Sequence, residues 1–302
     1  MSEIKPFDPS VPQDEVDRLF RKLKDTRLPQ IPVVPDADDD YGQFLNDFSW
    51  PDAQKQISKW YHYTTEIENL KVYFIHEKAR PSGSDQPSFD LVVPSLPGSC
   101  WSQGAPRGWT LQDTARIYDV LMKRLGYKTY VAQAGDWGHW VVRELGSGRY
   151  DACKAVHTNR STTILLAFMM FIGEEYQELA DPNLKTATLE NKQFNHDVCT
   201  MLPLYFFTPP PIITSMLCYY NNARHEVYTK FNAKEKNLIR VPLGVSTFPY
   251  DAFPVPEKGA ETTTTNLQFF KEQDHGGHFA CMECPKEMVN DIREFFPRFY
   301  KP

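Results

Sequence analysis

The spacing of apolar residues predicts alternating strands and helices in the first part of the chain. Near the N-terminus, apolar residues recur at steps of three and four: Val16, Leu19, Phe20 and Leu23. This spacing is typical of an amphipathic helix. Residues 65–76 predict a hairpin with an asparagine-containing turn, and the short apolar run over residues 89–94 predicts a buried parallel strand.

Strand and helix patterns then alternate between Thr110 and residue 145. Thr110 can cap a helix that Gly126 ends, and a strand over residues 127–133 and a helix over residues 137–145 follow. This succession indicates a parallel α/β sheet.

The pattern changes in the second half of the chain. Residues 164–179 predict a strongly apolar helix, and the stretch up to residue 240 is helical and interrupted by prolines. This change predicts a helical cap inserted into the α/β core. Strand patterns return over residues 240–248 and 266–270, and a helix over residues 282–300 closes the chain.

Composition narrows the class of protein. The chain has 302 residues, 41% hydrophobic and 24% charged, which fits a globular protein. A net charge of −6 without a basic stripe argues against nucleic-acid binding. With neither a secretory signal nor an apolar run of transmembrane length, the sequence predicts a soluble, cytoplasmic protein.

The cysteines predict neither a disulfide framework nor a metal site. The six are scattered, and Cys281 and Cys284 form a CxxC pair without a second ligand pair. We interpret these two as positions along one helix. No cofactor and no metal are predicted.

The strongest chemical motif is Ala134-Gly135-Asp136-Trp137-Gly138, between a predicted strand and a predicted helix. Small residues on both sides of a central nucleophile are typical of a nucleophile elbow, where the turn leaves no room for larger side chains. Asp136 stands where esterases carry serine, and a carboxylate can attack carbon directly to form an ester. The alternative is a plain helix N-cap, a common place for aspartate.

Two later loops supply partners for such a nucleophile. His278 lies in the glycine-rich stretch 274–279 after the last predicted strand, and Asp251 follows the preceding strand. An acid there can orient the histidine and stabilise its cation. Each motif alone also fits an ordinary loop, but the order acid, acid, histidine at strand ends favours a catalytic triad.

Six further segments match one family over nearly the whole chain: Ile4–Phe7, Asp25–Pro29, Thr64–His76, Leu91–Gly98, Asp151–His157 and Gly276–Phe279. With the motifs above, they resemble the microsomal-type epoxide hydrolases, especially the fungal members. The resemblance implies an α/β-hydrolase fold, a mostly parallel sheet flanked by helices, with a shortened helical cap and an N-terminal extension that braces it. It divides the chain into residues 1–62 (extension), 63–160 (first part of the core), 161–239 (cap) and 240–302 (second part of the core).

The family also implies a role for each site residue. Asp136 would attack an epoxide carbon, and His278, oriented by Asp251, would activate water to cleave the ester and release a diol. Tyr228 would be one of two cap tyrosines that hydrogen-bond the epoxide oxygen, and the backbone N–H of Trp137 would be an oxyanion donor. The implied partners are a small lipophilic epoxide and, in a homodimer, a second copy of the chain.

The sequence departs from the family pattern at three places. The family's His-Gly-x-Pro strand, whose backbone helps to form the oxyanion hole, is absent, and only residues 77–88 occupy its interval. Loss of an interior strand would leave its neighbours with unpaired backbone groups. The cap segment with the other tyrosine is shortened, with Tyr176 and Tyr205 as candidates to replace it. A Trp-rich meander between Trp60 and Tyr61 is missing.

These departures leave several interpretations open. The chain is either a degenerate or repurposed family member, or one that lost internal segments, as an alternatively spliced message would give. The leading function is epoxide hydrolysis. The alternatives are the same ester chemistry on another electrophile, such as a haloalkane, and a catalytically silent binding protein. Retention of all three triad residues favours an enzyme.

Overall fold

The strands form two four-stranded sheets. The computed structural model describes residues 3–25, 48–79, 86–159, 180–185, 189–207, 212–223, 238–251 and 254–300. The first sheet is antiparallel in the order β1 (Lys5–Pro6), β2 (His62–Ile67), β3 (Leu70–Glu77), β4 (Leu91–Pro94). The second is parallel in the order β5 (Tyr130–Ala134), β6 (Cys153–Asn159), β7 (Leu243–Thr247), β8 (Leu267–Glu272). The predicted α/β class and the later strands are confirmed.

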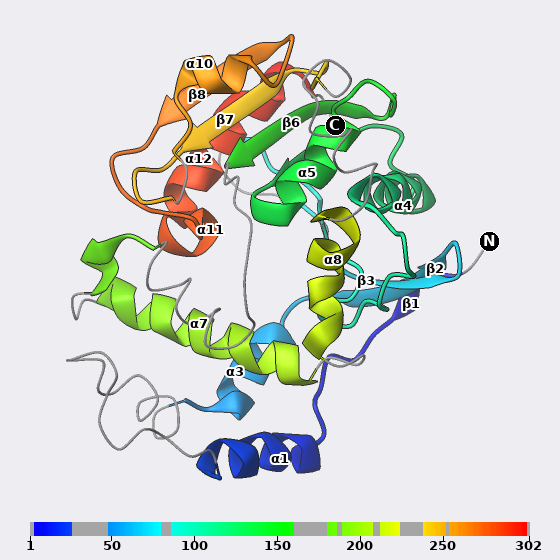
Figure 1. The fold of residues 1–302 in the computed structure, drawn as a ribbon, viewed down its shortest axis with the longest axis vertical. Helices are drawn as coiled ribbons and strands as arrows, with labels where there is room; N and C mark the ends of the chain where they lie inside the picture. Colours follow the sequence, from blue (N-terminus) through cyan, green and yellow to red (C-terminus); the bar gives the residue numbers. More distant parts are fainter. Residues whose placement is uncertain are drawn as a thin grey trace.

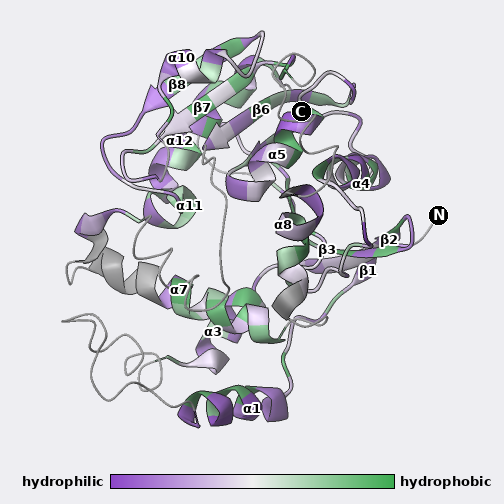
Figure 2. Ribbon diagram, viewed as in Figure 1, coloured by the Kyte–Doolittle hydropathy of each residue, from purple (hydrophilic) through white to green (hydrophobic). Residues whose placement is uncertain are grey.

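Helices surround these sheets (Figure 1). Those of the N-terminal half are α1 (Gln13–Lys24), α3 (Trp50–Ile57), α4 (Leu111–Arg124) and α5 (Asp136–Leu145). Those of the C-terminal half are η1 (Pro182–Lys185), α7 (Leu189–Phe207), η2 (Ile212–Met216), α8 (Leu217–Ala223), α10 (Glu257–Glu261), α11 (Ala280–Glu283), α12 (Pro285–Phe295) and η3 (Phe296–Arg298). Along α1 and α4, hydrophobic and hydrophilic residues alternate as expected of amphipathic helices (Figure 2). None of the helices in the described part of the chain has the length and apolar character needed to cross a membrane.

The hairpin follows the sequence prediction closely. β2 and β3 are joined by Glu68 and Asn69, both with positive φ (55° and 61°). Positive φ at both central residues matches the twist of a two-residue hairpin, and asparagine tolerates it. The helix predicted after Thr110 is also confirmed: the Asp113 carboxylate accepts the Thr110 backbone N–H at 2.8 Å, and Gly126 adopts a φ of 92° just after the helix.

The parallel sheet is packed on both faces. On β6, Val156 belongs to an apolar cluster with Val141 and Val142 of α5. The next side chain points the other way, and Ala155 packs against Phe295 and Phe296. The sheet is therefore sandwiched between α5 and α12, which fixes where its strand ends lie.

A buried carboxylate ties α12 to the strands that precede the site loops. Asp291 is fully buried and accepts hydrogen bonds from Ser246 Oγ (2.6 Å), Lys271 Nζ (2.6 Å) and Gln273 Nε2 (2.7 Å). A buried charge is tolerated only when it is paired and hydrogen-bonded. These three donors meet that condition and join α12 to β7, to β8 and to the chain just after β8.

β4 contradicts the sequence prediction. We expected a buried parallel strand over residues 89–94, but β4 pairs antiparallel with β3 and leaves Leu91 54% and Val93 53% exposed. Among the described residues, no strand pairs with the other edge of β4, and β5 likewise borders an open edge. β4 and β5 are thus edge strands of two separate sheets, and the sequence lacks the His-Gly-x-Pro strand that the family carries. Side chains that an interior strand would bury therefore face solvent.

The closing helix also differs from its prediction. It breaks between α11 and α12, where Cys284 has φ −136° and ψ 60° and Pro285 begins α12. Proline disfavours the helical conformation at the residue before it, and α11 ends at Glu283, so Cys281 and Cys284 do not share one helix. The six cysteines, all in described segments, form no disulfide.

The N-terminal helices pack against the helix that begins at Leu189. The Trp50 and Phe207 rings lie 4.6 Å apart, and the Arg18 guanidinium lies 5.4 Å from the Phe206 ring centre. Figure 1 shows α7 lying between α1 and the sheets. The helix predicted over residues 164–179 lies outside the described residues, and the four-part division of the chain stays a prediction.

Candidate active site

Asp136 sits on a strained turn between β5 and α5. Its φ is 44°, in the left-handed region that few residues other than glycine adopt. A Cβ at Gly135 would lie 2.6 Å from Asn159 Nδ2, and a Cβ at Gly138 would lie 2.8 Å from Ala134 Cβ. These contacts leave no room for larger side chains at the two glycines, as the motif predicted. It presents the Asp136 side chain at the carboxyl end of the strand.

The Asp136 carboxyl is both accessible and surrounded by protein. The residue is exposed to water, yet desolvation raises the pKa of its carboxyl above the ordinary value. The charge of His278 and a hydrogen bond from the Trp137 backbone N–H lower this pKa, whereas Asp251 raises it. A poorly hydrated but reachable carboxylate suits a nucleophile, because little water has to be removed before attack.

Asp251 and His278 meet through two neighbouring loops. The loops after β7 and β8 are joined by a parallel bridge between Tyr250 and Gly277, and the Tyr250 N–H donates to the Gly276 carbonyl at 3.2 Å. His278 Nδ1 lies 3.2 Å from Asp251 Oδ1, with both side chains largely buried. Because a carboxylate can only accept, Nδ1 carries the proton, and Nε2 is the nitrogen that can act as a base.

The structure thus brings together three of the predicted site residues, Asp136, Asp251 and His278. Trp137 also lies at the site, with a buried side chain and its backbone N–H directed at the Asp136 carboxylate. Tyr228 and Tyr176 lie outside the described residues, and Tyr205 is a half-buried residue of α7. No group of three or more His, Cys, Asp or Glu residues that could hold a metal ion occurs in the described segments.

The helix α8 contributes two residues that sequence reasoning missed. The Tyr219 ring packs edge-on against the Trp137 ring, with centroids 4.6 Å apart. Burial, and then the negative charge of Asp136, raise the pKa of the Cys218 thiol to about 12, so the thiol stays neutral beside the nucleophile. The paired tyrosines at 219 and 220 were the one available signal, but nothing in the local pattern connected them to the elbow.

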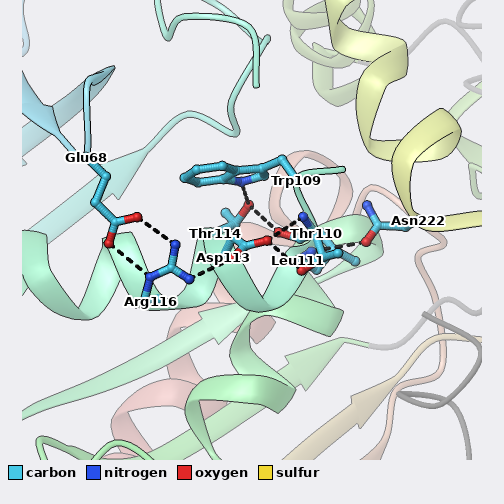
Figure 3. Close-up of polar contacts among 8 residues, drawn as sticks. All are labelled: Glu68, Trp109, Thr110, Leu111, Asp113, Thr114, Arg116 and Asn222. Atoms are coloured by element: carbon cyan, nitrogen blue, oxygen red, sulfur yellow. Dashed lines mark hydrogen bonds and ion pairs between the residues drawn. The ribbon is translucent and has the colours of Figure 1, made fainter. Parts of the chain in front are cut away.

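Two asparagines dock α8 onto the core. Asn222 Oδ1 accepts the Leu111 N–H at 3.1 Å, and Asn221 Oδ1 accepts the Gly108 N–H at 3.4 Å. Figure 3 shows Asn222 reaching the first turn of α4, so a residue of α8 satisfies an otherwise unpaired helix donor. The cavity between the two helices measures about 20 Å³, room for a water molecule and not for a substrate.

Gly276 fixes the path of the His278 loop. Its φ is 85°, and a Cβ there would overlap Cys284 Sγ and lie 3.0 Å from Phe248. We expect Gly276→Ala to lower the free energy of unfolding by roughly 2–4 kcal/mol, through backbone strain plus overpacking. Chemical denaturation would measure this. Gly126→Ala is the matched control, because φ there is 92° with nothing within 4 Å of the added Cβ. Equal losses in the two variants would show that the packing at Gly276 costs nothing.

Comparison with protein families gives a match over the first third of the chain. Residues 4–103 match the family model described as the epoxide hydrolase N terminus. Epoxide hydrolase 1 of Sus scrofa is 22% identical over 410 aligned positions, which span 97% of this chain and 88% of the relative. Because the chain has only 302 residues, internal segments of that relative have no counterpart here.

Two solved structures are similar to this protein over nearly its whole length. An enantioselective mutant of the epoxide hydrolase from Aspergillus niger is 25% identical, with a TM-score of 0.79, 99% of this chain covered and 97% of the other. The juvenile hormone epoxide hydrolase of the silkworm Bombyx mori has the same TM-score at 20% identity, covering 98% of this chain and 94% of the other. At that identity, the silkworm enzyme supports the fold alone.

Proposed function

The chain belongs to the epoxide hydrolases of the α/β-hydrolase fold, and on that premise we propose that it converts an epoxide to a vicinal diol through an ester on Asp136. The observation that carries the proposal is the geometry at the strand ends. A strained elbow presents Asp136, and the His278–Asp251 pair lies close enough for its charges to change the Asp136 pKa.

The first half-reaction forms the ester. One Asp136 oxygen attacks an epoxide carbon, the carbon–oxygen bond of the ring breaks, and the ring oxygen leaves as an alkoxide that takes up a proton. Donors on the cap would stabilise this alkoxide as its charge develops. We assign that role to Tyr228, as the family resemblance implies.

The second half-reaction restores the enzyme. His278 Nε2 takes a proton from water, and the resulting hydroxide attacks the ester carbonyl carbon of Asp136. The Trp137 N–H, which already faces this carboxyl group, would donate to the oxyanion. When the tetrahedral adduct collapses, the leaving alkoxide takes the proton back from the His278 imidazolium, and the diol leaves with an oxygen from Asp136. The carboxylate keeps an oxygen from water, and the other proton of that water replaces the one taken up in the first half-reaction. Asp251 stabilises the imidazolium throughout.

Single-turnover hydrolysis in ¹⁸O-water tests this sequence of steps. Aryl and alkyl epoxides would be offered to excess enzyme, and the Asp136 peptide would be weighed by mass spectrometry. We expect diol formation together with ¹⁸O in the Asp136 carboxylate. Diol without label in that peptide would indicate direct attack by water and would contradict the ester.

One observation favours a silent binding protein instead. In the part of the chain that the structure describes, no strand pairs with β4 or β5 on the edges where the oxyanion-forming strand is expected, and loss of one oxyanion donor costs on the order of 10²–10³ in rate. A folded protein that gives neither diol nor label with these epoxides would support that alternative. Label from a haloalkane, but not from epoxides, would support the other electrophile.

The raised Asp136 pKa predicts the pH dependence of ester formation. Only the ionised carboxylate is a nucleophile, so the rate should fall as pH drops through this pKa. Because desolvation raises the pKa, the fall should begin at a higher pH than for an ordinary aspartate. Rapid-quench measurement of ester formation between about pH 4 and 8 would check this. An acid limb at or below the ordinary aspartate range would contradict the expectation.

The proposal includes the setting in which the protein acts. The substrate would be a small lipophilic epoxide, the protein would reside in the cytoplasm, and two copies would form a homodimer. Six cysteines that form no disulfide agree with a reducing compartment. Sedimentation of the purified chain would test the dimer, and a single monomeric species at micromolar concentration would contradict it.

A further inference from the structure

The loop that carries His278 is held by two carboxylates outside the triad. Glu283, at the end of α11, accepts the Phe279 N–H on Oε1 at 2.8 Å and the Asp181 N–H on Oε2 at 2.7 Å. Asp181 in turn accepts the Gly276 N–H on Oδ2 at 2.9 Å. The backbone on both sides of His278 is therefore fixed to side chains that do not belong to the triad.

The strength of this arrangement comes from charge and burial. Asp181 is 3% exposed, and hydrogen bonds from N–H groups to carboxylates are about twice as strong as neutral ones. Burial, the largest influence, keeps the Glu283 pKa above its ordinary value, and the nearby charge of Asp181 also raises it; backbone bonds from Asp181, Phe279 and Gly277 act in the opposite direction. The geometry shows both Glu283 oxygens acting as acceptors, each from a different backbone N–H group.

A simple helix cap does not explain these contacts. The bond to Phe279 alone would be an ordinary local cap of α11. However, the second Glu283 oxygen holds Asp181, which lies 102 residues earlier in the chain, and Asp181 returns to the loop at Gly276. The two carboxylates therefore link the backbone before His278, at Gly276, to the backbone after it, at Phe279.

We propose that Glu283, with Asp181 as its companion, is a positioning residue for His278 in the hydrolytic half-reaction. The inference rests on the function proposed above, because only there does His278 act as the base. A displacement of about 1 Å from a productive geometry can cost on the order of 10²-fold in rate. Ester formation depends on Asp136 and needs no such alignment.

Glu283→Gln separates the two half-reactions. Glutamine has the same shape, but it replaces one acceptor oxygen with an NH₂ group that faces a backbone N–H. Rapid-quench measurement should show ester hydrolysis slowed by about 10- to 100-fold, with ester formation nearly unchanged. Asp181→Asn should slow the same step. Glu294→Gln is the matched control, because Glu294 is an exposed residue of α12 that pairs with Arg298.

A second measurement works without substrate. The ¹⁵N and ¹H signals of the His278 Nδ1–H report its bond to Asp251. They should shift or broaden in Glu283→Gln and Asp181→Asn and stay unchanged in Glu294→Gln. Equal hydrolysis rates in wild type and Glu283→Gln, or an unchanged Nδ1–H signal, would overturn the inference, as would an equal loss of both half-reactions. A wild-type protein that forms no ester would contradict the proposed function, and the Nδ1–H signal would then decide the positioning role by itself.

Discussion

Replacing Asp136 with asparagine is expected to abolish turnover, lowering kcat by on the order of 10⁴-fold or more. An amide cannot attack an epoxide carbon, and the elbow presents no other carboxylate in its place. Asparagine suits this test because it tolerates the φ of 44° that would strain alanine. Steady-state diol formation gives the rate, and circular dichroism with thermal unfolding verifies the fold.

The control for this variant is Asp151→Asn, the same change at an exposed residue just before β6. It should keep wild-type turnover, because its side chain lies outside the site. If Asp136→Asn retained a tenth or more of the wild-type rate, Asp136 would not be the nucleophile. The elbow would then have to be interpreted as a helix N-terminus.

The second large effect is expected from His278→Gln, which should trap the enzyme as its ester. Attack by Asp136 needs no base, whereas cleavage of the ester needs a deprotonated water. Nδ1 is bound to Asp251 at 3.2 Å, so we assign the proton from water to Nε2 on the opposite side of the ring. Steady-state turnover should fall by on the order of 10³-fold or more. The intact protein mass should increase by the mass of one epoxide.

His275→Gln provides the comparison, because His275 is an exposed neighbour that pairs with Asp274. It should neither accumulate ester nor lose turnover. If His278→Gln lost turnover without accumulating ester, His278 would be needed before or during the first step. That result would contradict the assignment of His278 to hydrolysis alone.

The parts of the site that the sequence predicted depend on local geometry or on chain order. The elbow could be predicted because a tight turn restricts its own neighbours, as the contacts of Gly135 and Gly138 demonstrate. Asp251 and His278 could be paired because parallel strands end on the same edge of a sheet. The break before Pro285 also follows from the conformational restriction that a proline places on the residue before it.

The parts that the sequence did not predict depend on contacts between distant segments. The exposure of β4 follows from the lack of a second neighbouring strand among the described segments, which the composition of residues 91–94 cannot reveal. The place of Tyr219 beside Trp137 depends on Asn221 and Asn222, which bind backbone groups more than a hundred residues earlier. Such docking leaves no periodic signal in a helix of only seven residues.

The long connection between β6 and β7 has a consequence for how the chain can change in length. These strands pair directly, although residues 160–242 lie between them, so folding has to close a large loop before this pairing forms. The entropy of closing a flexible loop grows only with the logarithm of its length, about 0.6 kcal/mol per doubling. Shortening this connection therefore changes the closure cost by a few tenths of a kcal/mol, whereas loss of an interior strand removes a whole ladder of backbone hydrogen bonds. In this fold, a change in length therefore destabilises the protein far less in the connection between β6 and β7 than in the sheet.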